Sequence, residues 1–256
     1  MVVIMSKLTD THCHLQHDRF KDDLNEVIDE TEKNLAFTIV SGANKEWNRK
    51  AIDISKKSKN IYATIGLHPI DAEKMSEKEF QEELKFVEEN KDNLVGIGEI
   101  GLDFHWEKDE KMRDLQKERF VRFLNLSKNL NLPVVIHSWD AEIEVLDILE
   151  KEKMKKVVMH CFSGNLELME KALELGYYIS ISTIILRSKS TRKLARDCPL
   201  EKMLLETDAP YLWLDGKRNV PWNTEYAAEK IAKIRKITKD EVLEATLNNA
   251  KKIFGI

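Results

Sequence analysis

The sequence predicts an α/β fold, namely a (β/α)8 TIM barrel with one extra helix at the C-terminus. Its length of 256 residues suits one such barrel. Short apolar runs alternate regularly with longer amphipathic runs, and this alternation requires parallel strands. The competing fold, an open doubly wound sheet, needs a glycine-rich phosphate-binding turn after an early strand. Gly96, Gly98 and Gly101 are a poor candidate for that turn, because they straddle a predicted strand end with Glu99 between them.

Eight short apolar runs, rich in Val, Ile and Leu, have the length and composition of buried parallel strands. In chain order, the predicted strands are residues 8–12, 36–40, 62–67, 95–99, 133–137, 157–160, 177–181 and 203–206. Parallel strands of a closed barrel present their carboxyl ends on one face, where the active sites of such barrels lie.

Each predicted strand is followed by a segment with helical periodicity. These segments are residues 18–34, 44–58, 77–90, 113–130, 141–152, 165–175, 188–197 and 224–236, the last after a long loop. One further helix is predicted at 239–252. Because no linker rich in Pro, Gly or Ser interrupts the pattern, we expect residues 1–256 to form a single domain.

Composition limits the possible partners. The formal net charge is −4, so any nucleic-acid binding would have to depend on bound metals and on a local cluster of Lys and Arg. The three cysteines lack a C-x-x-C pair, which argues against a disulfide framework or a zinc finger and favours a reducing compartment. The apolar run from Met1 to Met5 is too short for a signal peptide. We therefore expect a cytoplasmic protein without a membrane span.

Histidines gather at the predicted strand ends. Five of the seven lie there, at positions 12, 14, 68, 137 and 160. Side chains two apart in a strand share a face, so His12 and His14 can converge on one ion while Cys13 points the other way. A single histidine at the end of an apolar strand, such as His137 or His160, is more often a hydrogen-bonded core residue. Two of them on adjacent strands favour a pair of metal ligands.

Two acidic residues complete the expected site. Glu99 ends the strand at 95–99, where an unpaired carboxylate is costly to bury. It can bridge two cations or form a salt bridge with a barrel Lys or Arg. Asp208 follows the last strand, which lies beside the first in a closed barrel, so it should face His12 and His14 and can accept a proton. Two divalent ions sharing Glu99 would lower the pKa of a bridging water from about 16 toward about 7.

Six ordered motifs resemble the TatD family of metal-dependent deoxyribonucleases, within the amidohydrolase superfamily. They are Asp10–Leu15 (DTHCHL), Ile65–Pro69 (IGLHP), Gly98–Asp103 (GEIGLD), His160–Gly164 (HCFSG), Glu206–Leu212 (ETDAPYL) and Gly216–Asn219 (GKRN). The resemblance runs from about residue 8 to the C-terminus.

The resemblance implies two divalent ions per subunit, such as Mg²⁺, Mn²⁺ or Zn²⁺. It implies that His12, His14 and Asp208 hold one ion, that His137 and His160 hold the second, and that Glu99 bridges them. Glu99 and Asp208 are then the catalytic acids.

Other motif residues have less specific roles. His68 is expected to contact substrate phosphate, or else to be a turn histidine before Pro69. Asp10 and Glu206 are candidates to support the metal ligands. Asp103 is expected to orient the loop that carries Glu99.

Basic and aromatic side chains near the same face favour a phosphodiester substrate. The family resemblance implies that this substrate is DNA and that the activity is a 3′-to-5′ exonuclease acting on single strands. The basic residues are Lys217 and Arg218 in one loop and Arg187, Lys189, Arg192 and Lys193 in another. They can hold phosphates or be solvated surface charges. The aromatic residues are Trp106, Trp139, Trp213 and Trp222. Their indoles can stack on bases or pack the loops together.

Three departures from the family pattern lie on the rim and concern substrate preference. Trp139 stands where many members have Arg, Ser182 and Thr183 where Gly is usual, and Val220 where Glu is usual. The alternative function is therefore a carbonyl hydrolase of the amidohydrolase type, acting on a small ester, amide or lactone with the same two ions. No obligate protein partner is evident.

Overall fold

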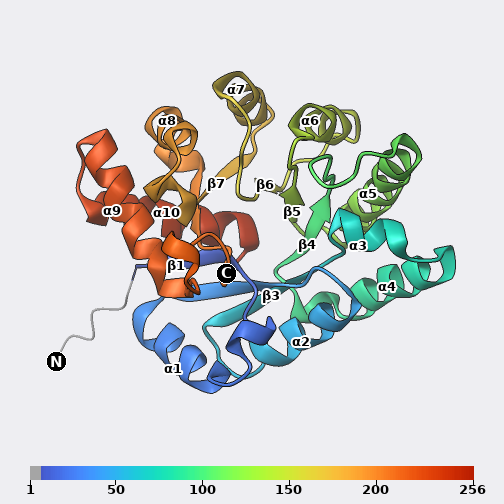
Figure 1. Cartoon of the computed structure of the whole chain (residues 1–256), viewed down its shortest axis with the longest axis horizontal. Coiled ribbons are helices and arrows are strands. Elements are labelled where there is room, and N and C mark those ends of the chain that lie inside the picture. The colour runs from blue at the N-terminus through green and yellow to red at the C-terminus, as the bar shows by residue number, and fades with distance from the viewer. Residues whose placement is uncertain (1–6) are drawn as a thin grey trace.

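A computed structural model of the chain describes residues 7–256, and the apolar run from Met1 to Met5 lies outside this range. Eight parallel strands form one sheet in chain order, as the alternation predicts. The strands are β1 (Thr9–Cys13), β2 (Phe37–Ser41), β3 (Ile61–Ile65), β4 (Gly96–Gly101), β5 (Val134–His137), β6 (Val157–Met159), β7 (Tyr178–Ser182) and β8 (Met203–Glu206). The (β/α)8 barrel is confirmed, and its helices surround the strands (Figure 1).

The helices lie close to their predicted positions. They are α1 (Leu24–Asn34), α2 (Lys45–Ser55), α3 (Pro69–Lys74), α4 (Glu77–Glu89), α5 (Glu110–Leu130), α6 (Glu142–Lys151), α7 (Leu166–Glu174), α8 (Lys189–Asp197), α9 (Thr224–Arg235) and α10 (Lys239–Phe254). Local sequence sets several ends. Ser76 with Glu79 and Thr238 with Glu241 form capping boxes at the starts of α4 and α10. Gly255, in the left-handed region, ends α10.

Two helix predictions need correction. The segment at 18–34 is not one helix but a short 3-10 turn, Asp18–Phe20, followed by α1. Helix α3 was not predicted at all. It begins because Pro69 occupies the first turn, where a missing N–H costs nothing, and because the His68 side chain accepts a hydrogen bond from the Ile70 N–H.

The barrel closes between β8 and β1 just beyond the end of β8. Asp208 donates its backbone N–H to the His12 carbonyl at 2.9 Å, and His14 donates to the Ala209 carbonyl at 2.6 Å. The buried Asp10 carboxylate accepts hydrogen bonds from the Thr207 hydroxyl at 2.6 Å and the Thr207 N–H at 2.9 Å. These bonds hold the end of β1 beside the segment that carries Asp208.

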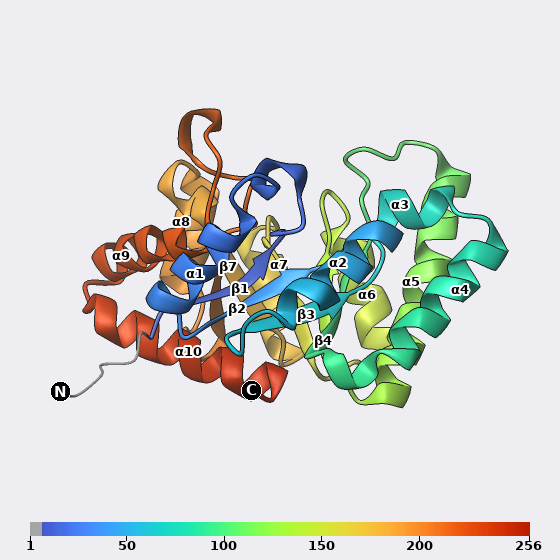
Figure 2. The same ribbon diagram turned by 90° about the horizontal axis from the view of Figure 1, so that it is seen from below.

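The core has two layers, one between strands and helices and one at the bottom of the barrel. In the bottom layer, Phe37, Val135 and Leu204 pack against Ile253 and Phe254 of α10. Helix α10 therefore closes the amino-terminal end of the barrel. Figure 2 shows it along one edge of the molecule, with the loops that follow β1 and β8 projecting from the opposite edge. No helix within residues 7–256 is long and apolar enough to span a membrane.

Candidate metal centre

The predicted ligands converge at the carboxyl end of the barrel. They come from the ends of β1, β4 and β5 and from the segments directly after β6 and β8. All of them except the fully buried His12 line a cavity of about 760 Å³, together with His68, Trp47 and several residues of the rim. The structure thus brings together side chains that lie far apart in the chain.

A first group of ligand atoms lies at the end of β1. The two Nε2 atoms of His12 and His14 are 3.2 Å apart. Oε2 of Glu99 lies 3.5 Å from the first and 3.7 Å from the second. Bonds of about 2.0–2.2 Å at ordinary coordination angles separate ligand atoms by about 3.0–3.8 Å, so this triangle fits one ion. Oδ1 of Asp208 lies 3.3 Å from His14 Nε2 and 3.7 Å from His12 Nε2, on the same group.

A second group meets the other oxygen of the same carboxylate. Oε1 of Glu99 lies 2.9 Å from Nδ1 of His137 and 4.0 Å from Nε2 of His160. Both groups are sets of His and carboxylate atoms within 4.8 Å of one another. The Glu99 side chain, which is 6% exposed, therefore stands between them. Within residues 7–256, its recorded ion pairs are with imidazoles rather than with a Lys or Arg.

Each of the four imidazoles has its second nitrogen held by another protein group. The Ser41 hydroxyl lies 3.1 Å from Nδ1 of His12, and the Ser41 carbonyl lies 2.8 Å from Nδ1 of His14. Asp103 lies 3.0 Å from Nε2 of His137. Such partners fix ring orientation and strengthen a histidine as a metal ligand. The arrangement fits a metal centre better than four unrelated core histidines.

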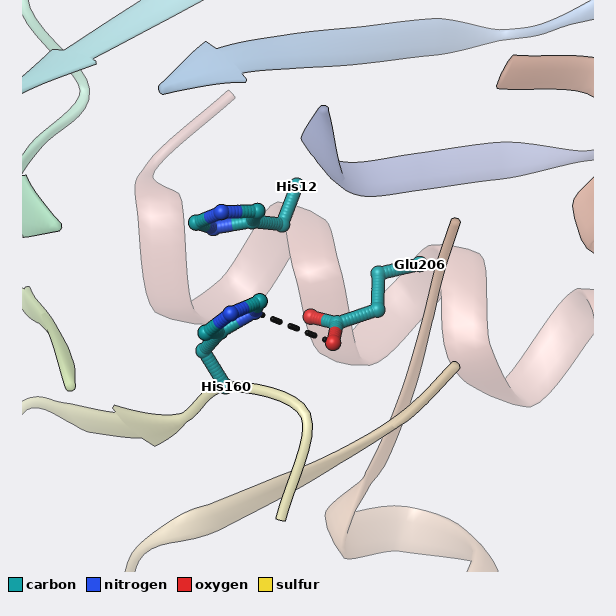
Figure 3. A group of neighbouring side chains, drawn as sticks. All are labelled: His12, His160 and Glu206. Atoms are coloured by element: carbon teal, nitrogen blue, oxygen red, sulfur yellow. Dashed lines mark ion pairs between the residues drawn. The ribbon is translucent and has the colours of Figure 1, made fainter. Parts of the chain in front are cut away.

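The fourth imidazole, His160, is held by Glu206 (Figure 3). Its Nδ1 lies 3.0 Å from Oε1 of Glu206, and that oxygen also accepts the Cys161 N–H at 2.7 Å. The His160 ring stacks on the His12 ring, with centroids 3.6 Å apart. This stack brings a ring of the first group of ligand atoms against a ring of the second.

Charge in the cluster is balanced between acids and imidazoles. Burial alone would raise the pKa of Glu99, but hydrogen bonds from His12 and His137 hold it well below its usual value. Burial would lower the pKa of His137 and His160, but Asp103 and Glu99 raise the first to about 9, and Glu206 raises the second to about 10. The carboxylates around these imidazoles thus favour positive charge at the cluster, and a bound cation would supply that charge.

His68 lies near the second group. Its Nε2 is 3.8 Å from Glu99 Oε1 and 3.8 Å from Asp103 Oδ2. Burial, with His137 nearby, lowers the pKa of His68 to about 4, so its ring is neutral at pH 7. Its Nδ1 caps α3. The two expected roles, at the site and in the turn before Pro69, are thus compatible in one side chain.

Local backbone conformation helps to position Asp208 and the pair formed by Glu99 and His137. Asp208 has a φ of 58°, in the left-handed region that Asp tolerates better than most residues. This turn follows β8 directly. Gly101 has a φ of 144°, and a Cβ at this position would collide with the His137 carbonyl. The glycine therefore allows β4 and β5 to approach closely where Glu99 and His137 meet.

The basic residues that were expected to contact phosphate have other partners in the structure. Neither Lys217 nor Arg218 lines the cavity. The Arg218 guanidinium instead forms two short bonds to the Asp23 carboxylate, at 2.7 and 2.5 Å. In the other basic loop, Arg187 donates to the Trp213 carbonyl, and Arg192 donates to the Ile185 and Leu186 carbonyls. In the structure, these guanidinium groups are therefore hydrogen-bonded to backbone or carboxylate oxygens of the protein.

Ser41 is the site residue that the sequence analysis missed. It ends β2 and is fully buried, and it contacts both imidazoles of the H-x-H motif. A signal was present, because Ser41 is a polar residue at the carboxyl end of a buried strand, the position at which the other ligand-bearing strands carry polar side chains. Asp10, expected as a support for the H-x-H pair, accepts the backbone N–H of His12 at 3.2 Å and also closes the barrel through Thr207.

Comparison with known proteins agrees with this geometry. A family model described as TatD related DNase matches residues 9–255. The uncharacterized metal-dependent hydrolase YabD of Bacillus subtilis is 36% identical, over 97% of this chain and 99% of its own length. The deoxyribonuclease TATDN3 of Homo sapiens is 33% identical, over 96% of this chain and 94% of its own. The crystal structure of YJJV, a TatD homolog from Escherichia coli, superposes with a TM-score of 0.90 at 29% identity, covering 98% of each chain.

Proposed function

Because this chain belongs to the TatD family of metal-dependent hydrolases, we propose that it is a deoxyribonuclease that removes nucleotides from the 3′ end of single-stranded DNA. The supporting observation is the position of Glu99, whose two carboxylate oxygens face two separate groups of imidazoles. One carboxylate can therefore be shared by two divalent ions. Two such ions would polarise a phosphoryl oxygen and make a water a nucleophile near neutral pH.

We assign the ligands in two sets that share Glu99. His12, His14 and Asp208 would hold one ion, and His137 and His160 would hold the other. Each imidazole presents one ring nitrogen to the cluster and is oriented through the other, as metal-binding histidines generally are. Imidazole and carboxylate ligands suit Zn²⁺, Mn²⁺ and similar ions.

Asp208 is the proposed general base. Its side chain is 16% exposed, the most open of the six proposed ligands, so it can reach a water in the cavity. Interactions with His14, His160 and His12 overcome the effect of burial and lower the pKa of Asp208. The carboxylate is therefore ionised and able to accept a proton. His68 stands on the opposite side of Glu99, where its neutral ring can donate a hydrogen bond to a substrate oxygen.

One observation keeps the carbonyl hydrolase as a second candidate. No Lys or Arg is found among the residues that line the cavity, as far as residues 7–256 show. Phosphate charge would then be balanced by the ions alone, and an uncharged ester, amide or lactone would also fit. The names of the DNase relatives favour the phosphodiester.

The test is digestion of a single-stranded oligonucleotide labelled at either end. We expect Mg²⁺ or Mn²⁺ to support digestion, a chelator to stop it, and a 5′ label to give a ladder that shortens from the 3′ end. Asp208→Asn should keep the fold, measured by circular dichroism, and lose turnover by orders of magnitude. If the protein leaves DNA intact but hydrolyses small esters or lactones, the carbonyl candidate replaces the nuclease.

We further propose that residues 1–256 act as a single domain in the cytoplasm, without an obligate protein partner. In support, one continuous sheet includes every strand of residues 7–256. The three cysteines are free, as suits a reducing compartment.

A further inference from the structure

The four rim tryptophans divide into two pairs in the structure. Trp213 packs on Tyr226, with ring centroids 5.4 Å apart, and Trp222 packs against the core. Trp106 and Trp139 are different, because both line the cavity and remain exposed, at 67% and 40%. Large exposed indoles at the mouth of a cavity usually contact a ligand. Only this second pair is placed to do so.

His105, Trp106 and Trp139 form a small aromatic platform. The His105 imidazole lies parallel to the Trp139 indole, with centroids 3.9 Å apart and an interplanar angle of 2°. Trp106 meets both rings edge-on, at 5.0 and 6.0 Å. Since His105 covers one face of Trp139, a further flat ring can stack only on the opposite face, while Trp106 packs against the edge of the stacked pair.

The platform is tied to the metal centre. The backbone N–H of Trp106 donates to Oδ1 of Asp103 at 2.8 Å, and the other oxygen of Asp103 lies 3.0 Å from Nε2 of His137. Phe104 donates its N–H to the Trp139 carbonyl at 3.0 Å, which joins the two loops. Trp139 follows His137 by two residues, so their Cα atoms are at most about 7 Å apart. The platform therefore lies directly beside the proposed ligand His137.

The charge of the cavity wall also favours a ligand that carries a flat ring. With no Lys or Arg lining the cavity among the described residues, the wall offers rings rather than cations. A substrate with both a phosphate and a flat ring would match the ions with the first and the platform with the second.

We propose that Trp139, with Trp106 beside it, stacks on the nucleobase of the nucleotide whose phosphate lies at the metal centre. The proposal rests on the proposed function, since it names the part of a nucleic acid that this rim recognises. It makes Trp139 and Trp106 binding residues and gives the enzyme a preference for phosphates that carry a base. Stacking tolerates any of the four bases, so little sequence preference is expected.

The test compares two ligands that share a phosphate and differ in the base. Deoxyadenosine 5′-monophosphate and 2-deoxyribose 5-phosphate are titrated into the metal-loaded protein by calorimetry. We expect the nucleotide to bind about 5- to 150-fold more tightly, the range for loss of one base stack. Trp139→Ala and Trp106→Ala should each reduce this preference, and Trp139→Phe should keep most of it. Trp213→Phe, an indole outside the cavity, is the matched control and should leave the preference unchanged.

Equal affinity for both ligands in the wild type, or an unchanged preference in folded Trp139→Ala and Trp106→Ala, overturns the proposal. Because Trp106 is 67% exposed, its truncation leaves the interior intact and keeps the test decisive if Trp139→Ala does not fold. Oligonucleotide digestion is measured separately. Digestion without a base preference defeats only the stacking proposal, whereas a base preference without digestion defeats only the nuclease.

Discussion

Nε2 of His137 lies 3.0 Å from Oδ2 of Asp103, while Nδ1 of the same ring lies 2.9 Å from Oε1 of Glu99. The imidazole is thus held between two carboxylates of different function. Glu99 faces the ligand cluster, whereas Asp103 approaches from the opposite side of the ring. This carboxylate–histidine pair orients Nδ1 toward the centre and increases its basicity, as is common around protein-bound metals.

Replacing Asp103 by Asn should therefore weaken the ion at His137 without emptying the site. Loss of such an outer carboxylate typically costs 10- to 100-fold in metal affinity or activity, so we expect a change of about that size. Asn keeps an oxygen for the Trp106 N–H. Affinity for the weaker ion is measured by calorimetric titration with Mn²⁺. Asp140→Asn is the control, since Asp140 pairs with His105 at 2.9 Å, outside the ligand cluster. Equal effects of the two substitutions would contradict the assignment.

Removing the Glu99 carboxylate should affect both ions at once. Its two oxygens face different groups of imidazoles, so Glu99→Ala deprives each ion of a ligand. We expect about two ions per chain in the wild type and fewer than one in the variant, measured by elemental analysis after dialysis. His160→Ala, which removes a ligand from one group only, should retain one ion. A Glu99→Ala protein that still holds one ion with wild-type affinity would exclude the shared carboxylate.

The sequence was sufficient for the parts of the site that depend on strand geometry. Alternation along β1 placed His12 and His14 on one face and turned Cys13 away, toward the Thr38 hydroxyl at 3.3 Å. Barrel closure placed Asp208 beside them. These inferences work because a parallel barrel fixes where each strand ends, whatever the intervening helices contain.

Contacts between loops that lie far apart in the chain could not be predicted from the sequence. Arg218 was expected at a phosphate, but its partner Asp23 lies 195 positions earlier in the chain. Nothing in the sequence distinguishes the four rim tryptophans, but in the structure Trp106 and Trp139 are the exposed ones. Local charge or aromatic character does not determine the direction of a loop side chain, which depends on packing between segments. The short helix α3 was missed because six residues carry too little periodicity.

Substitution of Arg218 can distinguish the expected phosphate contact from the ion pair with Asp23 that the structure shows. In the structure its ion pair with Asp23 joins the loop after β8 to the start of α1, and its guanidinium lies over the Phe20 ring. A partly exposed pair of this kind contributes at most about 1 kcal/mol, which corresponds to a decrease in Tm of about 2–4 °C.

Arg218→Ala should therefore lower Tm slightly and leave the KM for an oligonucleotide unchanged. Asp23→Asn should have the same effect, and the double variant should be no worse than either alone. The measurements are calorimetric melting and steady-state kinetics. A raised KM with an unchanged Tm would restore Arg218 to a substrate contact. Lys217→Ala is the matched control for loss of positive charge in the same loop.

Glu73 gives the protein a pH-dependent stability that does not involve the metal ligands. The residue lies on α3, is 9% exposed and accepts a hydrogen bond from Gln116 Nε2 at 2.5 Å. Burial, together with the neighbouring Glu107 carboxyl, raises the pKa of Glu73 to about 7. An unfolded chain has a Glu pKa of about 4.3. Between these values the folded chain binds more protons, so the free energy of unfolding falls as pH rises from about 4.5 to 7.

Glu73→Gln should remove this loss of stability, because Gln stays neutral and keeps an acceptor oxygen for Gln116. We expect the variant and the wild type to melt at similar temperatures at pH 4.5, and the variant to melt higher at pH 8. The difference in Tm between the two proteins isolates Glu73 from all other titrating groups. Glu88→Gln, an exposed position on α4, is the control and should give the same difference at both pH values. If the Glu73→Gln difference is also independent of pH, the carboxyl is ionised in the folded protein throughout this range, and burial has not raised its pKa.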